Sequence, residues 1–320
     1  MPNHEKPILY GLLFVDREAS DHVNLGKTHV DPFETYMRCA ATCAASLAFH
    51  GQEFHLITNR EEYVRRRMKI SRLPEMSVVG HQFSLKVPPK IPFYSAHFKL
   101  EVIEAFGRGH FGEYLALIDI DTVMCAPLSL PLIPQKAIVS YDITEQMVSE
   151  YGGYGELRRD LERVSGATVN SPRWFGGEFL LGHMESFRLI SEQVARVWPR
   201  YVDSISVLHH VGDEVLLSAA LAALPGMGIV DAGESGLLTR WWTARTGFKQ
   251  SPFEQVLKRS ILHLPSDKPF LASWADRSFD PTAFITAYKR TARVKLALRR
   301  IYNTSCGLLA GERKFVARIT

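Results

Sequence analysis

The stretch LALIDIDTV, residues 115–123, is strongly hydrophobic but carries two aspartates in its second half. We expect a single strand over Tyr114–Met124, and because alternate residues of a strand share a face, Asp119 and Asp121 point the same way. Two neighbouring carboxylates in apolar surroundings are costly unless a cation neutralises them. Hard oxygen ligands favour Mg²⁺ or Mn²⁺. The stretch therefore predicts a divalent-metal site at the carboxyl end of a central strand, where open α/β sheets bind ligands.

Strand-like and helix-like segments alternate through residue 141, which predicts an α/β fold with a parallel sheet and helices on both faces. Gly51 and Gly107 follow two of the helical segments, as C-terminal glycines do. The other expected strands of this half are Ile8–Val15, Glu53–Thr58, Ser77–Val79 and Ala137–Tyr141, and the expected helices are Phe33–His50, Glu61–Arg72 and Ser95–Phe106.

The second half of the chain changes character at residues 142–172, which are polar, contain three glycines between 152 and 155, and show little periodicity. They predict a mobile or excursive segment. After it we expect the strands Phe175–Leu181 and Ser260–Leu264 and the helices Ser186–Trp198, Asp213–Leu224 and Pro281–Ile301. The expected division is a catalytic domain over 1–280 and a basic helical tail over 281–320.

The composition of the 320 residues, 46% hydrophobic and 22% charged, is that of a globular protein and excludes a disordered chain. A net charge of +4 is too small to indicate a nucleic-acid partner. Residues 281–320 carry nine Lys or Arg against one acid, so this segment is +8 and the remainder is −4. Four cysteines do not make a disulfide framework, and no apolar run approaches the ~20 residues of a membrane span. The expected compartment is the cytoplasm.

A late segment, HLPSDKPF over residues 263–270, adds an imidazole and a lysine. The neutral imidazole of His263 can complete an octahedral site begun by the two aspartates, and Lys268 can pair with diphosphate oxygens. The alternatives are a hydrogen-bonded core histidine and a lysine in a solvated turn. For the aspartates, the alternative is a pair of surface residues in a turn at the end of the strand.

Asp-x-Asp followed by a late His…Lys-Pro-aromatic segment resembles the retaining glycosyltransferases that include glycogenin and the bacterial lipopolysaccharide galactosyltransferases. The resemblance covers about 8–270 and implies a GT-A fold, an α/β fold with a mostly parallel nucleotide-binding sheet flanked by helices. It also implies transfer of a sugar from a nucleotide-diphosphate donor such as a UDP-sugar, with retention, to a saccharide or lipid-linked saccharide. The family's His-x-x-Gly-x-x-Lys-Pro-Trp is one residue shorter here, with Ser266 in place of the glycine and Phe270 in place of the tryptophan.

The same resemblance assigns roles to individual residues. Asp119, Asp121 and His263 would hold Mn²⁺ or Mg²⁺. Lys268 would contact the diphosphate, and Lys99 stands where the family has a basic donor-binding residue. Asp16, which ends the first expected strand, is a further candidate for binding the donor.

Two short segments also resemble the blood-group A/B transferase family, in which they flank the reactive sugar carbon: WFGGEF at residues 174–179 and GDEVL at 212–216. Gly176 and Gly177 suit a backbone that approaches a ligand closely, and a β-bulge is the competing interpretation. By the resemblance, Glu214 or Asp213 would act catalytically on the oxocarbenium-like centre. Both residues also suit an ordinary helix start, where acids offset the helix dipole.

Two further features are a pair of tryptophans and an amphipathic helix near the end of the sequence. Of Trp241 and Trp242, we expect one in the core and the other in an acceptor pocket. The helix Pro281–Ile301 carries an apolar stripe with cationic flanks, which suits the surface of an anionic membrane at the inner face of a bacterial cell; packing on the acidic body is the alternative.

Two other functions fit the motifs. A metal-dependent phosphohydrolase would use Asp119 as its nucleophile, since Asp-x-Asp-x-Val also occurs in such enzymes. A catalytically silent protein that binds sugar nucleotides would explain the shortened His–Lys spacing and Ser266.

Overall fold

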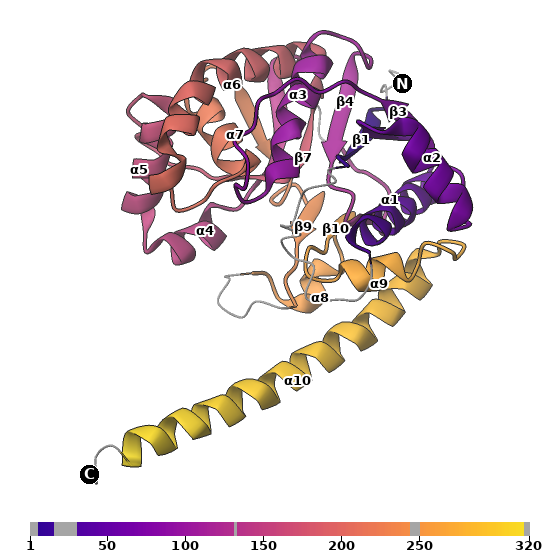
Figure 1. Cartoon of the computed structure of the whole chain (residues 1–320), viewed down its shortest axis with the longest axis vertical. Helices are drawn as coiled ribbons and strands as arrows, with labels where there is room; N and C mark the ends of the chain where they lie inside the picture. Colours follow the sequence, from indigo (N-terminus) through magenta and orange to yellow (C-terminus); the bar gives the residue numbers. More distant parts are fainter. Residues whose placement is uncertain (1–5, 16–30, 131–132, 244–249, 317–320) are drawn as a thin grey trace.

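The computed structural model describes residues 6–15, 31–130, 133–243 and 250–316, with the backbone alone for 300–316. Its centre is a seven-stranded sheet in the order β3-β2-β1-β4-β7-β6-β8 (Figure 1). All neighbouring strands are parallel except for β7, which runs antiparallel to both β4 and β6. The strands are β1 (Ile8–Leu13), β2 (Phe54–Thr58), β3 (Ser77–Gly80), β4 (Tyr114–Ile118), β6 (Ala137–Asp142), β7 (Phe175–His183) and β8 (Gly228–Asp231). The predicted α/β class with a mostly parallel sheet is confirmed.

Helices flank this sheet and bury one apolar side of each against it. Helix α1 packs on β1 and β2, whereas α6 packs against α3, α7 and β7. The larger helices are α1 (Pro32–Phe49), α2 (Glu61–Ile70), α3 (Lys99–Gly107), α6 (Met184–Ser204) and α7 (Asp213–Ala222), and the short ones are α8 (Phe253–Val256) and α9 (Lys268–Ala272). All five side chains of β4 are buried, as expected of the central strand.

The expected single strand Tyr114–Met124 is wrong, because the chain turns between β4 and β5 (Thr122–Met124). The hydroxyl of Thr122 donates to the carbonyl of Asp119 at 2.6 Å and closes this turn. Strand β5 then joins a second, three-stranded sheet in the order β5-β10-β9. Its other members are β10 (Ile261–His263) and β9 (Leu238–Arg240). The two aspartates are therefore brought together by a buried turn between two sheets and not by alternation along one strand.

The expected excursive segment at 142–172 is also wrong in part, since it holds α4 (Thr144–Tyr151) and α5 (Tyr154–Ser165). Leu157, Leu161 and Val164 lie on the buried side of α5, at the spacing of helical turns. Gly152 and Gly166 adopt left-handed conformations, with φ of 77° and 69°, where the two helices end. Of the three glycines that suggested a loop, Gly152 is thus the C-cap of α4, Gly153 precedes α5, and Gly155 lies in its first turn.

The last helix, α10 (Pro281–Val316), continues past the expected end at Ile301. Phe284, Tyr288 and Ala292 are fully buried in a second core beside β5 and β10. Packing on the body, the alternative considered for this helix, is correct for its first three turns, and Figure 1 shows the remainder projecting away from the body. Among the described residues, no helix combines the length and apolar character that a bilayer span requires. The division of the chain at residue 280 stays a prediction.

Candidate active site

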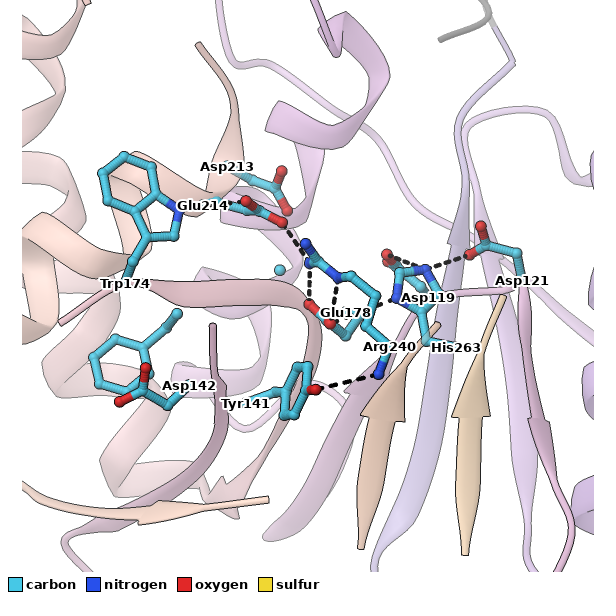
Figure 2. Close-up of polar contacts among 12 residues, drawn as sticks. Asp119, Asp121, Tyr141, Asp142, Trp174, Glu178, Asp213, Glu214, Arg240 and His263 are labelled. Atoms are coloured by element: carbon cyan, nitrogen blue, oxygen red, sulfur yellow. Dashed lines mark hydrogen bonds and ion pairs between the residues drawn. The ribbon is translucent and has the colours of Figure 1, made fainter. Parts of the chain in front are cut away.

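The three predicted metal ligands lie together where β4 ends (Figure 2). One ligand atom from each of Asp119, Asp121 and His263 lies within 4.8 Å of the other two. The Nε2 atom of His263 is 3.2 Å from Asp121 Oδ1 and 3.8 Å from Asp119 Oδ2. The pairing of β10 with β5 places His263 opposite Thr122, directly beside the aspartate turn. Two carboxylates and one imidazole are a donor set that fits a divalent cation such as Mn²⁺ or Mg²⁺.

Each aspartate of this group also has a lysine partner. Lys99 Nζ lies 2.6 Å from Asp119 Oδ1, and Lys268 Nζ lies 2.5 Å from Asp121 Oδ2. Burial raises the pKa of Asp119 more than Lys99 lowers it. At Asp121 burial acts in the same direction, but Lys268 and then His263 outweigh it and hold the pKa well below the usual value. In this structure Lys268 pairs with Asp121, and the contact of Lys268 with a diphosphate stays a prediction.

The two acids at the start of α7 point into the site. Asp213 Oδ2 accepts from Lys99 Nζ at 2.9 Å, and Lys99 also donates to the carbonyl of Gly177 at 2.9 Å. Glu214 Oε1 accepts from Arg240 Nη2 at 2.5 Å, and Glu214 Oε2 accepts from the indole of Trp174 at 3.3 Å. Neither contact caps the helix. The geometry therefore goes beyond the helix-start alternative, although a catalytic role for Asp213 or Glu214 stays a prediction.

A buried ion pair that the sequence analysis missed lies between these two groups. Arg240 Nε and Nη2 donate to the two carboxylate oxygens of Glu178, at 2.7 and 2.5 Å. Glu178 has no exposed surface. Burial raises its pKa, but Arg240 and then His263 outweigh burial and lower it to about 2. Glu178 belongs to the segment 174–179, where the glycines drew attention, and Arg240 directly precedes the two tryptophans.

Gly176 and Gly177 leave room for carboxylates of this chain. A Cβ atom at Gly176 would lie 1.8 Å from Glu178 Oε2, and one at Gly177 would lie 2.0 Å from Asp213 Oδ2. The register between β6 and β7 also shifts here, from the pair Ser140–Leu180 to the pair Tyr141–Gly176, which agrees with an irregularity of the bulge kind. Binding of a donor by these glycines stays a prediction.

The remaining predicted residues fall in different places. Trp241 lies in the second core against Phe253, as expected for one tryptophan of the pair. Trp242 is also buried, with its backbone bonded to the side chain of Gln250, and its place in an acceptor pocket stays a prediction. Asp16 lies outside the described residues.

Comparison with known proteins shows a similarity in fold. No family model and no curated protein sequence matches the chain. The apo structure of WbbM, a bifunctional glycosyltransferase, matches with a TM-score of 0.52 and 11% identity over 88% of this chain and 52% of that one. The apo form of mouse xyloside xylosyltransferase 1 matches with a TM-score of 0.50 and 12% identity over 83% of this chain and 99% of that one.

A third match, the galactosyltransferase LgtC in complex with donor and acceptor sugar analogues, has a TM-score of 0.49 and 11% identity over 84% of this chain and 96% of that one. The chain spans about half the length of WbbM and nearly all of the xylosyltransferase. A special likeness to the blood-group A/B transferases stays a prediction. The chain has the GT-A-like fold of glycosyltransferases.

Proposed function

We propose that the protein is a metal-dependent glycosyltransferase that moves a sugar from a nucleotide-diphosphate donor, such as a UDP-sugar, to a hydroxyl of a saccharide or lipid-linked saccharide. The observation that carries the proposal is the group of Asp119, Asp121 and His263 at the carboxyl end of β4. The solved structures compared above that share this fold are glycosyltransferases. Nucleotide ligands of open α/β sheets bind at such strand ends.

The side chains around the group suit the departure of a diphosphate. A divalent cation held by Asp119, Asp121 and His263 would neutralise the charge that develops on the leaving group. Lys99 and Lys268, which hold the aspartates in this structure, would then be free to turn toward phosphate oxygens. Lysine suits this exchange, because its ammonium is a point charge on a flexible stem.

The two acids at the start of α7 are suited to act on the sugar of the donor. Asp213 and Glu214 present their carboxylates on the same side of the site, where Lys99 pairs with Asp213 and Arg240 pairs with Glu214. A carboxylate near the anomeric carbon stabilises an oxocarbenium-like transition state or traps it, and trapping followed by a second displacement retains the configuration. Retention by Glu214 or Asp213 is part of this proposal.

The test is release of UDP from a panel of UDP-sugars with Mn²⁺ or Mg²⁺, followed by mass spectrometry. Metal-dependent release from one or a few sugars, lost in Asp119→Asn, is the expected result. Release of phosphate from simple phosphate esters without any use of UDP-sugars would select the phosphohydrolase. Tight binding of UDP-sugars without turnover, even with acceptor saccharides present, would select the silent binding protein.

We also propose that the protein attaches peripherally to an anionic membrane at the inner, cytoplasmic face through α10. The buried positions Phe284, Tyr288 and Ala292 are excluded from that contact. What supports the proposal is the next part of the helix, in which Val294 and Leu298 are 59% and 61% exposed and Arg290 is exposed beside them. Such attachment would place the site beside a lipid-linked acceptor.

A further inference from the structure

A buried row of charges crosses the site from the metal group to α7 (Figure 2). His263 Nδ1 lies 3.5 Å from Glu178 Oε1. The Arg240 guanidinium donates to both carboxylate oxygens of Glu178, Oε1 included, and its Nη2 also reaches Glu214 at 2.5 Å. Arg240 therefore lies between His263, a proposed metal ligand, and Glu214, a proposed catalytic carboxylate. It contacts Glu214 directly and reaches His263 through Glu178.

The positions of these side chains are set by secondary structure. Arg240 on β9 and His263 on β10 are paired residues of neighbouring parallel strands. Glu178 lies on β7, and its carbonyl accepts from the backbone N–H of Asp119 at 2.9 Å. Sites built on strands and helices hold their geometry more exactly than sites built on loops.

The pair of Glu178 and Arg240 is not explained by stability alone. Two ions are costly to remove from water, and apolar residues of the same volume often serve a core as well or better. The pair also requires a glycine at position 176, because a Cβ atom there would lie 1.8 Å from Glu178 Oε2 and 2.7 Å from Arg240 Nη2. A planar guanidinium with several donors can orient two carboxylates at once, which neither a lysine nor an apolar residue can do.

We propose that Arg240 is a positioning residue that orients the Glu214 carboxylate directly and the His263 imidazole through Glu178. A carboxylate beside Nδ1 favours the imidazole tautomer with its proton on that nitrogen, which leaves the Nε2 lone pair for a cation held together with Asp119 and Asp121. The same guanidinium keeps Glu214 at a fixed place relative to the metal group. The inference rests on the proposed function for its effect on turnover but not for its effect on metal binding.

The experiment measures Mn²⁺ affinity by calorimetry, the coordinated imidazole nitrogen by pulsed electron paramagnetic resonance, and turnover by UDP release. In Glu178→Gln we expect Mn²⁺ affinity to fall about 10-fold or more, as when outer-shell partners of metal ligands are lost. In Arg240→Lys, which keeps the charge but not the fork, we expect the kcat for UDP release to fall at least 10-fold with little change in the donor KM.

Two further variants separate positioning from a structural role. Glu178→Met with Arg240→Met removes both ions of the buried pair together, and Glu214 keeps the indole of Trp174 as a partner. We expect this double variant to melt as a folded protein, with weaker Mn²⁺ binding and an altered nitrogen signal. Arg188→Lys, on the exposed side of α6, is the control and should match the unmodified protein.

Unchanged Mn²⁺ affinity, nitrogen signal and kcat in the folded double variant would overturn the inference. If the unmodified protein releases no UDP from any donor, the proposed function fails. The comparison of Mn²⁺ binding between the variants would still decide the inference about His263.

Discussion

The two ends of the site neutralise their carboxylates in different ways. At the metal end, Lys268 pairs with Asp121 at 2.5 Å, and Lys99 pairs with Asp119 at 2.6 Å while also holding Asp213 at 2.9 Å. At the α7 end, one guanidinium, that of Arg240, binds two glutamates, Glu214 and Glu178, the latter through two parallel hydrogen bonds. A lysine is a compact charge on a flexible stem, whereas an arginine is a rigid fork. The difference suggests that the metal end can exchange its ammonium groups for a cation and that the α7 end keeps a fixed geometry.

The largest effect is expected at the metal end, from Asp121→Asn. The neutral amide brings no negative charge to the cation and is a weaker ligand than the carboxylate, so Mn²⁺-dependent binding of UDP should be abolished. The change also leaves the buried Lys268 without its anion, and we expect the free energy of unfolding to fall by about 3 kcal/mol. Calorimetry with UDP and Mn²⁺, together with urea unfolding, measures both effects.

The matched control is Asp276→Asn, which changes a half-exposed carboxylate paired with Arg38. It should leave UDP binding intact and change stability little, because exposed ion pairs contribute little. Undiminished Mn²⁺-dependent binding in Asp121→Asn would show that the cation binds elsewhere.

The next effect is expected at the α7 end, from Glu214→Gln and Asp213→Asn. A carboxylate that acts mainly in the transition state should, on becoming an amide, lose kcat by on the order of 10²-fold with little change in donor affinity. If a residue only favours the helix start, its replacement should instead cost about 0.3–1 kcal/mol of stability and leave turnover unchanged. Measuring kcat, KM and thermal unfolding on both variants identifies the catalytic one. Full turnover in both would remove the acids of α7 from the mechanism.

A third prediction tests the contrast itself, by comparing Lys268→Met with Arg240→Met in thermal melts with and without Mn²⁺. Each change removes the nearest cationic partner of a buried carboxylate and should cost about 3 kcal/mol without metal. At Asp121 the cation can take the place of the missing ammonium, so Mn²⁺ should raise the melting temperature of Lys268→Met more than that of the unmodified protein. In Arg240→Met, Mn²⁺ should give no such extra gain. Equal gains in both variants would contradict the contrast.

The metal end could be predicted from the sequence, whereas most of the α7 end could not. Asp119 and Asp121 stand out because they interrupt the most apolar stretch, so their charge needs an explanation that surface residues do not need. Glu178 and Arg240 are 62 positions apart, and nothing local pairs them. Their meeting depends on the pairing of β9 with β10 across a second sheet, which single-strand patterns do not reveal.

The fold was predicted with the same limits. The parallel strands and their helices follow from apolar periodicity, but the end of β4 and the helices within 142–172 do not. An apolar run looks the same whether it stays in one sheet or turns into another. A glycine also looks the same in a loop and at a helix C-cap, because only its φ angle distinguishes the two.

The smallest effect is expected far from the site, on the part of α10 that leaves the body. Val294 and Leu298 lie four residues apart and are both exposed, so the double variant Val294→Asp with Leu298→Asp should remove apolar contact with a bilayer and add two repelling charges. The buried first turns are kept, because Tyr288 donates to the buried Asp267 and its loss would disturb the core beside Lys268. The control is Ile70→Asp, which changes another exposed apolar residue, on α2.

Vesicle sedimentation of the full chain gives the measurement, with anionic and neutral lipids at low and high salt. We expect the unmodified protein and the Ile70→Asp control to bind anionic vesicles at low salt and to lose most of this binding at high salt, because each basic residue near the surface adds only about 1 kcal/mol, which salt screens. The double variant should bind several-fold more weakly. Equal binding by all three proteins, or none by any of them, would limit α10 to its packing role, in which Phe284, Tyr288 and Ala292 cover the second core.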